Sequence, residues 1–448
     1  MIAERPPAGA PRPYRFPDFT QHRLANGLGV WLVPLPDREL VSIHLLTDAG
    51  AAAEDEAQAG LAALTAQLLV TGTRRLDAAA FAETTERLGI DVGSESSWDS
   101  ARAGFTALGT KLDEGLALLA EMIRTPRLDE REFDRLKAER LNDIMQARAD
   151  PGRLAEESFL RELYADDEPY GRLAAGRPET IEPLGIDDAQ AYHATHYAPN
   201  VANVVIAGAI DPDVTLTAVE RHLGDWSGDA PGHRTFTPRQ RSGRRVVLVD
   251  RPGSVQSELR VGHLGIDRYD DRFFPASVMA ALLGGVFMSR LNRRLREELG
   301  YTYGARSAFD PRRATGPFTA TAAVQTEVTV DSIREMVAQL EAIRQTAPEE
   351  AELAEVRDFL VGVFPLRFET TGGIAAAIEP LAVYGLPPDW WQSYRGNLEA
   401  VGTHDVLRVA RELVRPDEAL ILLTGDASVL RGELEAAELG PLEVISPA

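Results

Sequence analysis

The sequence predicts an α+β protein made of two homologous domains, each a mainly antiparallel sheet packed with helices. Strand signals alternate with segments of helical periodicity, and this order occurs once in each half of the chain. The two halves also end alike, because 201–208 and 419–425 are both hydrophobic strand-like runs that stop at a glycine. At 448 residues, the chain is long enough for two such domains, each with its own core.

The first domain is expected to span residues 1–225. Its opening hairpin is indicated by Asn26-Gly27, a pair that favours a type I′ turn. Strands are expected at 28–33, 41–47, 101–108 and 201–210. Helices are expected at 58–70, 77–88, 112–123 and 129–149. The 58–70 helix buries one face, since leucines recur there at helical spacing.

The second domain is expected to span residues 245–448 and to repeat this order. Strands are expected at 245–249, 257–264, 301–309, 318–324 and 419–424. Helices are expected at 273–299, 333–344 and 352–364. Residues 226–244 are predicted to be the linker, because glycine, proline, serine and charged residues are concentrated there.

The composition argues against some classes of binding partner. The formal net charge of −22 argues against nucleic acid and anionic membranes, because both are polyanions. A basic peptide would be attracted, although such charge most often maintains solubility. No run reaches the roughly 20 apolar residues of a membrane span, and residues 1–7 lack the apolar core of a signal peptide. We therefore expect a cytoplasmic protein; a periplasmic protein that has lost its leader fits equally.

The segment 60–73, which reads GLAALTAQLLVTGT, resembles the zinc-binding helix of the pitrilysin/insulinase metallopeptidases. In that family two histidines bind zinc and a glutamate between them activates water. Here Ala63 and Gln67 stand at the histidine positions, and Ala66 stands at the glutamate position. A methyl group cannot ligate zinc and a carboxamide is a poor substitute for imidazole. The resemblance therefore predicts no metal and no cofactor in this chain.

The third zinc ligand of the family is a glutamate further along the chain. Residues 137–144 resemble its surroundings loosely and place Asp143 at the ligand position. One shortened carboxylate does not hold a catalytic zinc. We therefore expect Asp143 to be a solvated or ion-paired helix residue.

A stronger resemblance lies in the second half. Residues 289–304 read SRLNRRLREELGYTYG and are similar to the family signature S-R-L-x-x-x-L-R-E-x-x-G-x-x-Y. The resemblance implies that Arg296 and Tyr303 act on the substrate. A guanidinium can hold a peptide carbonyl group, and a phenol can donate to the oxyanion of a tetrahedral intermediate. Gly300 is expected to end the helix, so that both side chains face one spot.

The register of this pair has an alternative. Arg294 and Tyr301 have the same spacing, and the residues after Arg296 match the pattern of the small family members better. Arg296 has a plainer interpretation as well, because a cation near a helix C-terminus stabilises the helix.

The resemblance is closest to the small members of the family, whose two-domain subunits pair into a chamber. It implies a non-catalytic, substrate-binding subunit of a heterodimeric zinc peptidase that supplies Arg296 and Tyr303 in trans. A zinc-bearing paralogous subunit would be the partner, and a peptide would be the substrate, added as a strand to a sheet edge of that partner. Two alternatives stay open: an inert scaffold subunit of a larger complex, and an intact peptidase that uses other ligands. The substrate, the partner's identity and the assembly state in isolation are open as well.

Overall fold

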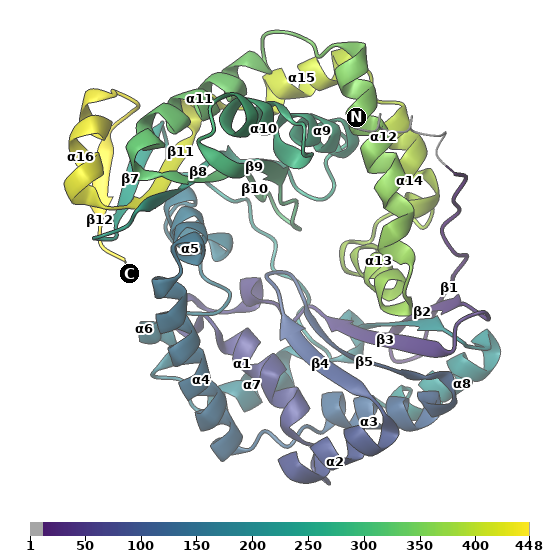
Figure 1. Cartoon of the computed structure of the whole chain (residues 1–448). Helices are drawn as coiled ribbons and strands as arrows, with labels where there is room; N and C mark the ends of the chain where they lie inside the picture. Colours follow the sequence, from purple (N-terminus) through teal and green to yellow (C-terminus); the bar gives the residue numbers. More distant parts are fainter. Residues whose placement is uncertain (1–11, 448) are drawn as a thin grey trace, which may run out of the picture.

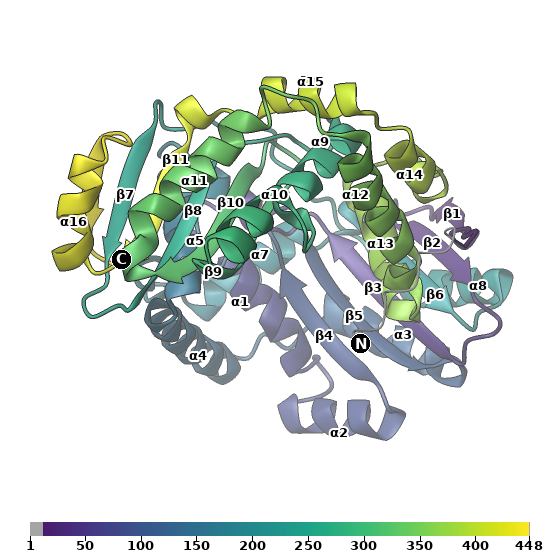
Figure 2. The ribbon, with the colours of Figure 1, turned by 45° about the horizontal axis from the view of Figure 1, so that its top comes forward.

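The structure is a computed structural model that describes residues 12–447 (Figure 1). Residues 1–7, on which the expectation about a leader rests, and residue 448 lie outside the described part. Two six-stranded sheets carry helices on their faces, which confirms the predicted α+β class with two homologous domains. Figure 2 shows the two sheets from a second direction, with the first sheet below the second.

The first sheet has the strand order β1-β2-β6-β3-β5-β4. Its strands are β1 (Thr20–Arg23), β2 (Gly29–Pro34), β3 (Leu40–Thr47), β4 (Asp91–Ser96), β5 (Ala101–Leu108) and β6 (Asn203–Gly208). Only the β2–β6 pair among them is parallel. The predicted hairpin between β1 and β2 forms, but Leu24 donates its N–H to the carbonyl of Leu28, so the loop has three residues instead of a type I′ pair.

The second sheet has the order β12-β7-β11-β8-β10-β9 and repeats the first from β7 to β9. Its strands are β7 (Arg245–Asp250), β8 (Gln256–Leu264), β9 (Thr302–Phe309), β10 (Pro317–Gln325), β11 (Leu420–Gly425) and β12 (Leu442–Ile445). The strand β7 is parallel to both β11 and β12. Both sheets are thus mixed, with antiparallel pairs in the majority, and β4 and β9 are equivalent edge strands.

Helices connect the strands of each half. The first half contains α1 (Leu61–Leu68), α2 (Ala78–Leu88), α3 (Leu112–Arg124), α4 (Glu130–Ala149), α5 (Pro151–Leu163), α6 (Pro178–Ile181), α7 (Ile186–His196) and α8 (Pro212–Leu223). The second contains α9 (Phe273–Ala280), α10 (Arg290–Asn292), α11 (Thr329–Ala342), α12 (Glu350–Val363), α13 (Thr371–Tyr384), α14 (Trp390–Glu399), α15 (Thr403–Leu413) and α16 (Ala427–Ala436). Between α8 and β7, residues 224–244 contain no helix and only one bridging residue.

The helix predicted over 273–299 is interrupted. Wide π-type turns continue α9 as η7 (Ala281–Gly285) and α10 as η8 (Arg293–Glu298), and an extended turn separates the two parts. The close approach of Gly284 to β9 accompanies this break, because a Cβ there would lie 2.3 Å from the backbone nitrogen of Ser307.

The run Phe273–Glu298 also corrects an expectation about hydropathy. By length and composition alone it could cross a membrane, with a mean hydropathy of 1.4 in its most apolar window. Its leucines, such as Leu283 and Leu291, are buried in the core of the second half against the sheet. Packing inside the protein therefore accounts for its apolar character.

Each sheet is covered on one face by helices of its own half and on the other by a helix from the opposite half. The helix α5 packs against β8 and β11 of the second sheet, and α13 packs against β3 and β6 of the first (Figure 1). Phe159 of α5 shares a core with Val247 and Leu422, and Ile378 of α13 shares one with Trp31 and Val205. The two halves are thus held together by burial of apolar side chains.

A buried carboxylate adds a polar connection between the halves. Asp99, in the turn between β4 and β5, accepts hydrogen bonds from the hydroxyls of Tyr170 at 2.5 Å and Tyr384 at 3.1 Å. The backbone N–H of Arg313, in the β9–β10 turn, donates to the same carboxylate at 3.0 Å. The guanidinium of Arg313 reaches Asp48 at the end of β3, also at 3.0 Å. The turns of both sheets are therefore joined where they meet.

Candidate functional site

The helix that resembles a zinc site is α1, and its side chains do not fit a metal. Ala66 is completely buried, Ala63 is 8% exposed and Gln67 is half-buried. The helix packs against α4, where Asp143 is exposed to solvent. Within residues 12–447, no three His, Cys, Asp or Glu side chains gather in a way that could hold a metal ion. The chain therefore has no donor set for zinc at this position.

A buried carboxyl group fixes the start of α1. Glu54 is 2% exposed and accepts hydrogen bonds from the backbone N–H groups of Gly60 at 3.1 Å and Ala62 at 2.5 Å. Such bonds satisfy donors that a helix N-terminus leaves without partners. Burial raises the pKa of Glu54 to about 8, and the two backbone hydrogen bonds oppose this rise. The helix frame is thus maintained although its ligand side chains are absent.

Two histidines on α7, His193 and His196, make contacts within the fold. His193 lies 2.8 Å from the carbonyl oxygen of Ile123 and stacks on Tyr197. His196 lies against the ring of Tyr192. Burial lowers the pKa of both histidines, which favours neutral rings.

The second motif forms a helix end, a turn and an edge strand. Gly300 has φ +66°, the left-handed conformation that glycine adopts without a steric penalty. The N–H of Tyr301 donates to the carbonyl of Leu295 at 2.8 Å, which closes the last turn of η8. Gly300 therefore ends the helix as predicted, and β9 begins two residues later.

Side chains of the two possible registers lie in different surroundings. Arg294 donates two hydrogen bonds to Glu335, at 2.8 and 2.9 Å, and one to Glu298 at 2.9 Å. Tyr301 packs on the core of the second half. Tyr303, in contrast, is 95% exposed. Arg294 and Tyr301 thus stabilise the fold, whereas Tyr303 is available to a ligand.

Arg296 rests on an aromatic ring. Its guanidinium carbon lies 4.1 Å from the centroid of Phe287, and its Nε lies 3.6 Å from the carboxylate of Glu297. Phe287 is itself 63% exposed, so the pair lies at the surface. No contact joins Arg296 to Tyr303 among the interactions of the described residues. A peptide between them would have to bridge the two side chains.

A β-bulge directs Tyr303. Thr302 pairs with Val324 and Ala305 with Ala322, so Tyr303 and Gly304 lie opposite a single residue of β10. The hydroxyl of Thr302 lies 2.7 Å from the carbonyl oxygen of Ala323 and accepts the N–H of Gly304 at 3.1 Å. Bulges of this kind re-aim a side chain and are common beside active sites.

The degenerate helix and the motif helix occupy equivalent places in the two halves. The helix α1 lies between β3 and β4, and the run from α9 to η8 lies between β8 and β9. The positions Ala63, Ala66, Gln67 and Asp143 therefore belong to the first half, and Arg296 and Tyr303 to the second. Sequence reasoning missed two residues of this region: Asn292, at a position that the family signature leaves open, and Phe287, which lies two residues before the signature begins at Ser289.

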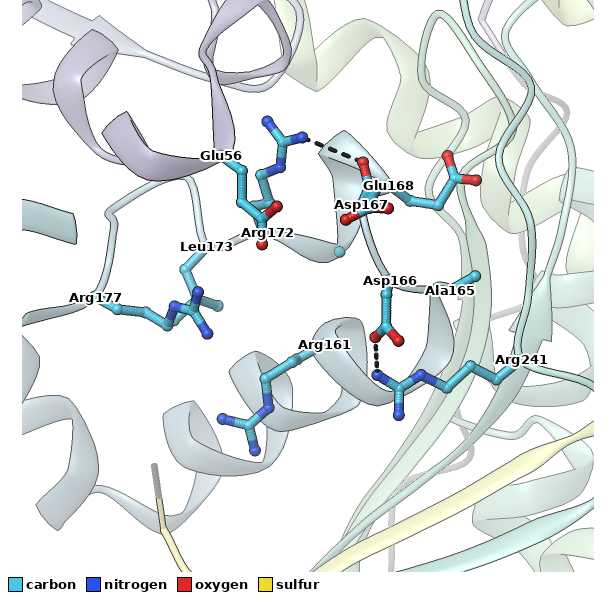
Figure 3. A pocket seen from close by; sticks show the side chains of 11 residues that line it. Glu56, Arg161, Ala165, Asp166, Asp167, Glu168, Arg172, Leu173, Arg177 and Arg241 are labelled. Atoms are coloured by element: carbon cyan, nitrogen blue, oxygen red, sulfur yellow. Dashed lines mark hydrogen bonds and ion pairs between the residues drawn. The ribbon is translucent and has the colours of Figure 1, made fainter. Parts of the chain in front are cut away.

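A further cavity, of about 190 Å³, lies beside α5 and is lined by charged side chains (Figure 3). These are Arg161, Arg172, Arg177, Arg241, Glu56, Asp166, Asp167 and Glu168. Arg241 binds Asp166 at 2.6 Å, and Arg172 donates to the carbonyl of Asp167 at 3.2 Å. Four positive and four negative charges cancel, so the cavity has no charge that would select a ligand.

Comparisons with known proteins agree with this geometry. Residues 30–174 match the family described as Insulinase (Peptidase family M16), and residues 183–360 match the Peptidase M16 inactive domain. Together the two matches cover more than two thirds of the chain. A Helicobacter pylori protein named Non-peptidase homolog YmxG is 26% identical over 370 residues, covering 81% of this chain and 84% of the relative. An uncharacterized zinc protease of Mycobacterium tuberculosis strain H37Rv is 26% identical over 400 residues, covering 87% and 90%.

Two solved structures share the fold. A peptidase M16 inactive domain from Pseudomonas fluorescens superposes with a TM-score of 0.86 at 24% identity, covering 91% of this chain and 98% of that one. A protease from Helicobacter pylori superposes with a TM-score of 0.85 at 20% identity, covering 91% and 100%. The arrangement of the two sheets is thus common to these proteins.

Proposed function

The chain belongs to the insulinase family of peptidases, M16, as an inactive member, and from that membership we propose that it is the substrate-binding subunit of a heterodimeric zinc peptidase. Ala63, Ala66 and Gln67 remove the ligands and the base that zinc peptidase chemistry needs. A paralogous partner with an intact zinc helix would supply zinc, the glutamate base and the third ligand. This chain would close the chamber around a peptide.

The observation that carries the proposal is the contrast between the two registers of the second motif. Arg294 and Tyr301 are engaged within the fold, while Tyr303 projects from an edge strand and Arg296 lies on a surface ring. A guanidinium and a phenol supply charge-assisted and neutral donors for the carbonyl and the oxyanion of a peptide. An exposed phenol and a half-buried guanidinium on one motif suit a role in trans.

The alternative function is an inert scaffold or core subunit of a larger complex. One observation favours it: the relative named Non-peptidase homolog YmxG is similar over most of its length. In that case Arg296 and Tyr303 would have no part in peptide cleavage. The same experiment distinguishes the two functions.

The test is co-expression of this chain with a paralogue that carries H-x-x-E-H, followed by peptide-cleavage kinetics. If each side chain makes one contact in the transition state, its removal costs about 2–4 kcal/mol, by analogy with other oxyanion donors. Arg296→Ala and Tyr303→Phe should each lower kcat/KM by about a hundredfold. Assembly, measured by gel filtration, should be unchanged.

Matched controls come from the same motif. Arg293→Ala removes an exposed arginine from the same helix, and Tyr301→Phe removes a hydroxyl from the other register. Both should leave the rate within about threefold of the wild type. Full activity in a well-assembled Arg296→Ala/Tyr303→Phe complex would move the chain to the scaffold class.

A further inference from the structure

The side chain of Asn292 joins three parts of the motif. Asn292 is 7% exposed and lies at the junction of α10 and η8. Its amide nitrogen lies 2.9 Å from the carbonyl oxygen of Ala305, 3.1 Å from Oγ of Ser289 and 3.2 Å from the carbonyl oxygen of Val286. Its amide oxygen accepts the N–H of Ala305 at 2.8 Å. One buried amide thus contacts the helix, the preceding turn and β9.

The hydrogen bonds between Asn292 and Ala305 take the place of bonds to a neighbouring strand. Ala305 pairs with Ala322 of β10 on one side of β9, while the other side is the free edge of the sheet. Asn292 exchanges both an N–H and a C=O bond with Ala305, as a paired residue of an adjacent strand does. This bond pair lies two residues beyond Tyr303. It therefore holds the bulged end of β9 against the helix that carries Arg296.

The contacts with the preceding turn act on the other functional side chain. Val286 and Ser289 bracket Phe287, and the N–H of Ser289 donates to the carbonyl of Val286 at 3.1 Å. Asn292 binds both ends of this turn. The ring of Phe287 then supports the guanidinium of Arg296 at 4.1 Å. Without the turn, an arginine side chain has several rotatable bonds and no fixed direction.

We propose that Asn292 is a positioning residue that fixes Tyr303 and Arg296 relative to each other, with Phe287 as the platform for Arg296. The inference rests on the proposed function of that pair. The physical reason is that the two donors sit on separate elements and share no contact, so their spacing depends on whatever joins the elements. Bound geometry matters steeply, since a misplacement of about 1 Å can cost a hundredfold in rate.

The first test uses hydrogen exchange on the full chain without a partner. Asn292→Ala should speed the exchange of amides in 286–289 and 302–306 by at least about tenfold. The control is Asn200→Ala, because Asn200 exchanges the same two bonds with the backbone of Ala230, at 2.9 and 3.0 Å. That control should leave both segments unchanged. Unchanged exchange in folded Asn292→Ala overturns the proposal whether or not the chain belongs to a peptidase.

The second test measures cleavage by the assembled heterodimer. Asn292→Ala should lower kcat by about tenfold or more with a smaller change in KM, since only the geometry of the donors is disturbed. The same substitution should have no further effect in an Arg296→Ala/Tyr303→Phe background. An equal loss in both backgrounds shows a merely structural role and overturns the proposal. A third outcome is full activity of the Arg296→Ala/Tyr303→Phe complex together with faster hydrogen exchange in Asn292→Ala. That outcome overturns the proposed function, and with it the catalytic role of the Asn292 contacts.

Phe287→Ala is the variant least able to disturb folding, because the ring is largely exposed. Loss of a surface cation–π contact predicts a two- to fivefold lower kcat, about 0.5–1 kcal/mol. The effect should vanish when Arg296 is already alanine. Phe359→Ala on α12, also half-exposed, is the control and should have no effect in either background. A Phe287→Ala effect that persists without Arg296 contradicts the platform role.

Discussion

Replacing Glu54 by glutamine is expected to destabilise the protein at low pH and to stabilise it at high pH. Burial holds the pKa of this carboxyl at about 8, against an ordinary value of 4.5. Between these values the folded chain keeps a proton that the unfolded chain has released. The folded state therefore binds more protons, and stability falls as pH rises through this window.

The magnitude follows from the two pKa values. A difference of 1 between the folded and unfolded pKa values corresponds to about 1.36 kcal/mol. Ionisation of Glu54 should therefore destabilise the wild type by about 1 kcal/mol at pH 5 and about 5 kcal/mol at pH 9. Glutamine carries no charge, but its NH₂ group faces the backbone N–H of Gly60 or Ala62 and loses one hydrogen bond, about 2 kcal/mol at every pH. Glu54→Gln should then be about 1 kcal/mol less stable at pH 5 and about 3 kcal/mol more stable at pH 9.

Urea denaturation of both proteins at pH 5, 7 and 9, followed by circular dichroism, measures this difference. Other titrating groups are common to both chains and cancel in the comparison. Glu369→Gln, directly after η10 (Phe364–Phe368) and exposed to solvent, is the control for replacing a surface carboxyl group by an amide. A Glu54→Gln difference that stays constant from pH 5 to pH 9 would refute the reasoning.

Two further outcomes are expected. The isolated chain should bind no stoichiometric zinc in metal analysis after dialysis, because α1 offers alanine and glutamine at the ligand positions. One tight zinc per chain, removed by chelator together with activity, would contradict this. Tyr170→Phe should cost about 2 kcal/mol of unfolding free energy, because its hydroxyl donates to the Asp99 carboxylate and accepts the N–H of Ala314. Tyr164→Phe should cost only about 1 kcal/mol, because its hydroxyl donates to the neutral carbonyl of Thr315. Equal costs in thermal or urea unfolding would show that the Asp99 connection adds nothing.

The periodicity of the sequence was sufficient to predict the fold class and most strands, because alternation and helical spacing are local properties. Strand pairing was harder. The parallel contacts of β2 with β6 and of β7 with β11 join the beginning and the end of each half, about 175 residues apart, and no local pattern encodes such a contact. The helix 151–163 was missed for a related reason. Asp150-Pro151 ends α4 and starts α5, and the direction of α5 depends on the sheet that it covers.

The candidate site likewise has one part that follows from the residue types and another that depends on the fold. The lack of zinc ligands at positions 63, 66 and 67 follows from the residue types alone, because no fold can give the methyl group of Ala63 or Ala66 a lone pair. The register of the second motif could not be decided from spacing, since Arg294 and Arg296 precede equally spaced tyrosines. In the structure the two arginines differ in their partners, because Glu335, 41 residues away in sequence from Arg294, binds Arg294. The role proposed for Asn292 could not be predicted either, because it depends on where the fold places Ala305.

The exchange of α5 and α13 makes each half of the chain dependent on the other. These two helices are equivalent, since each is the third helix after β5 or β10, and each covers the sheet of the other half. Either half alone would leave one face of its sheet uncovered and its own third helix without a surface to cover. Cleavage between 224 and 244 should, for the same reason, leave two fragments that remain associated.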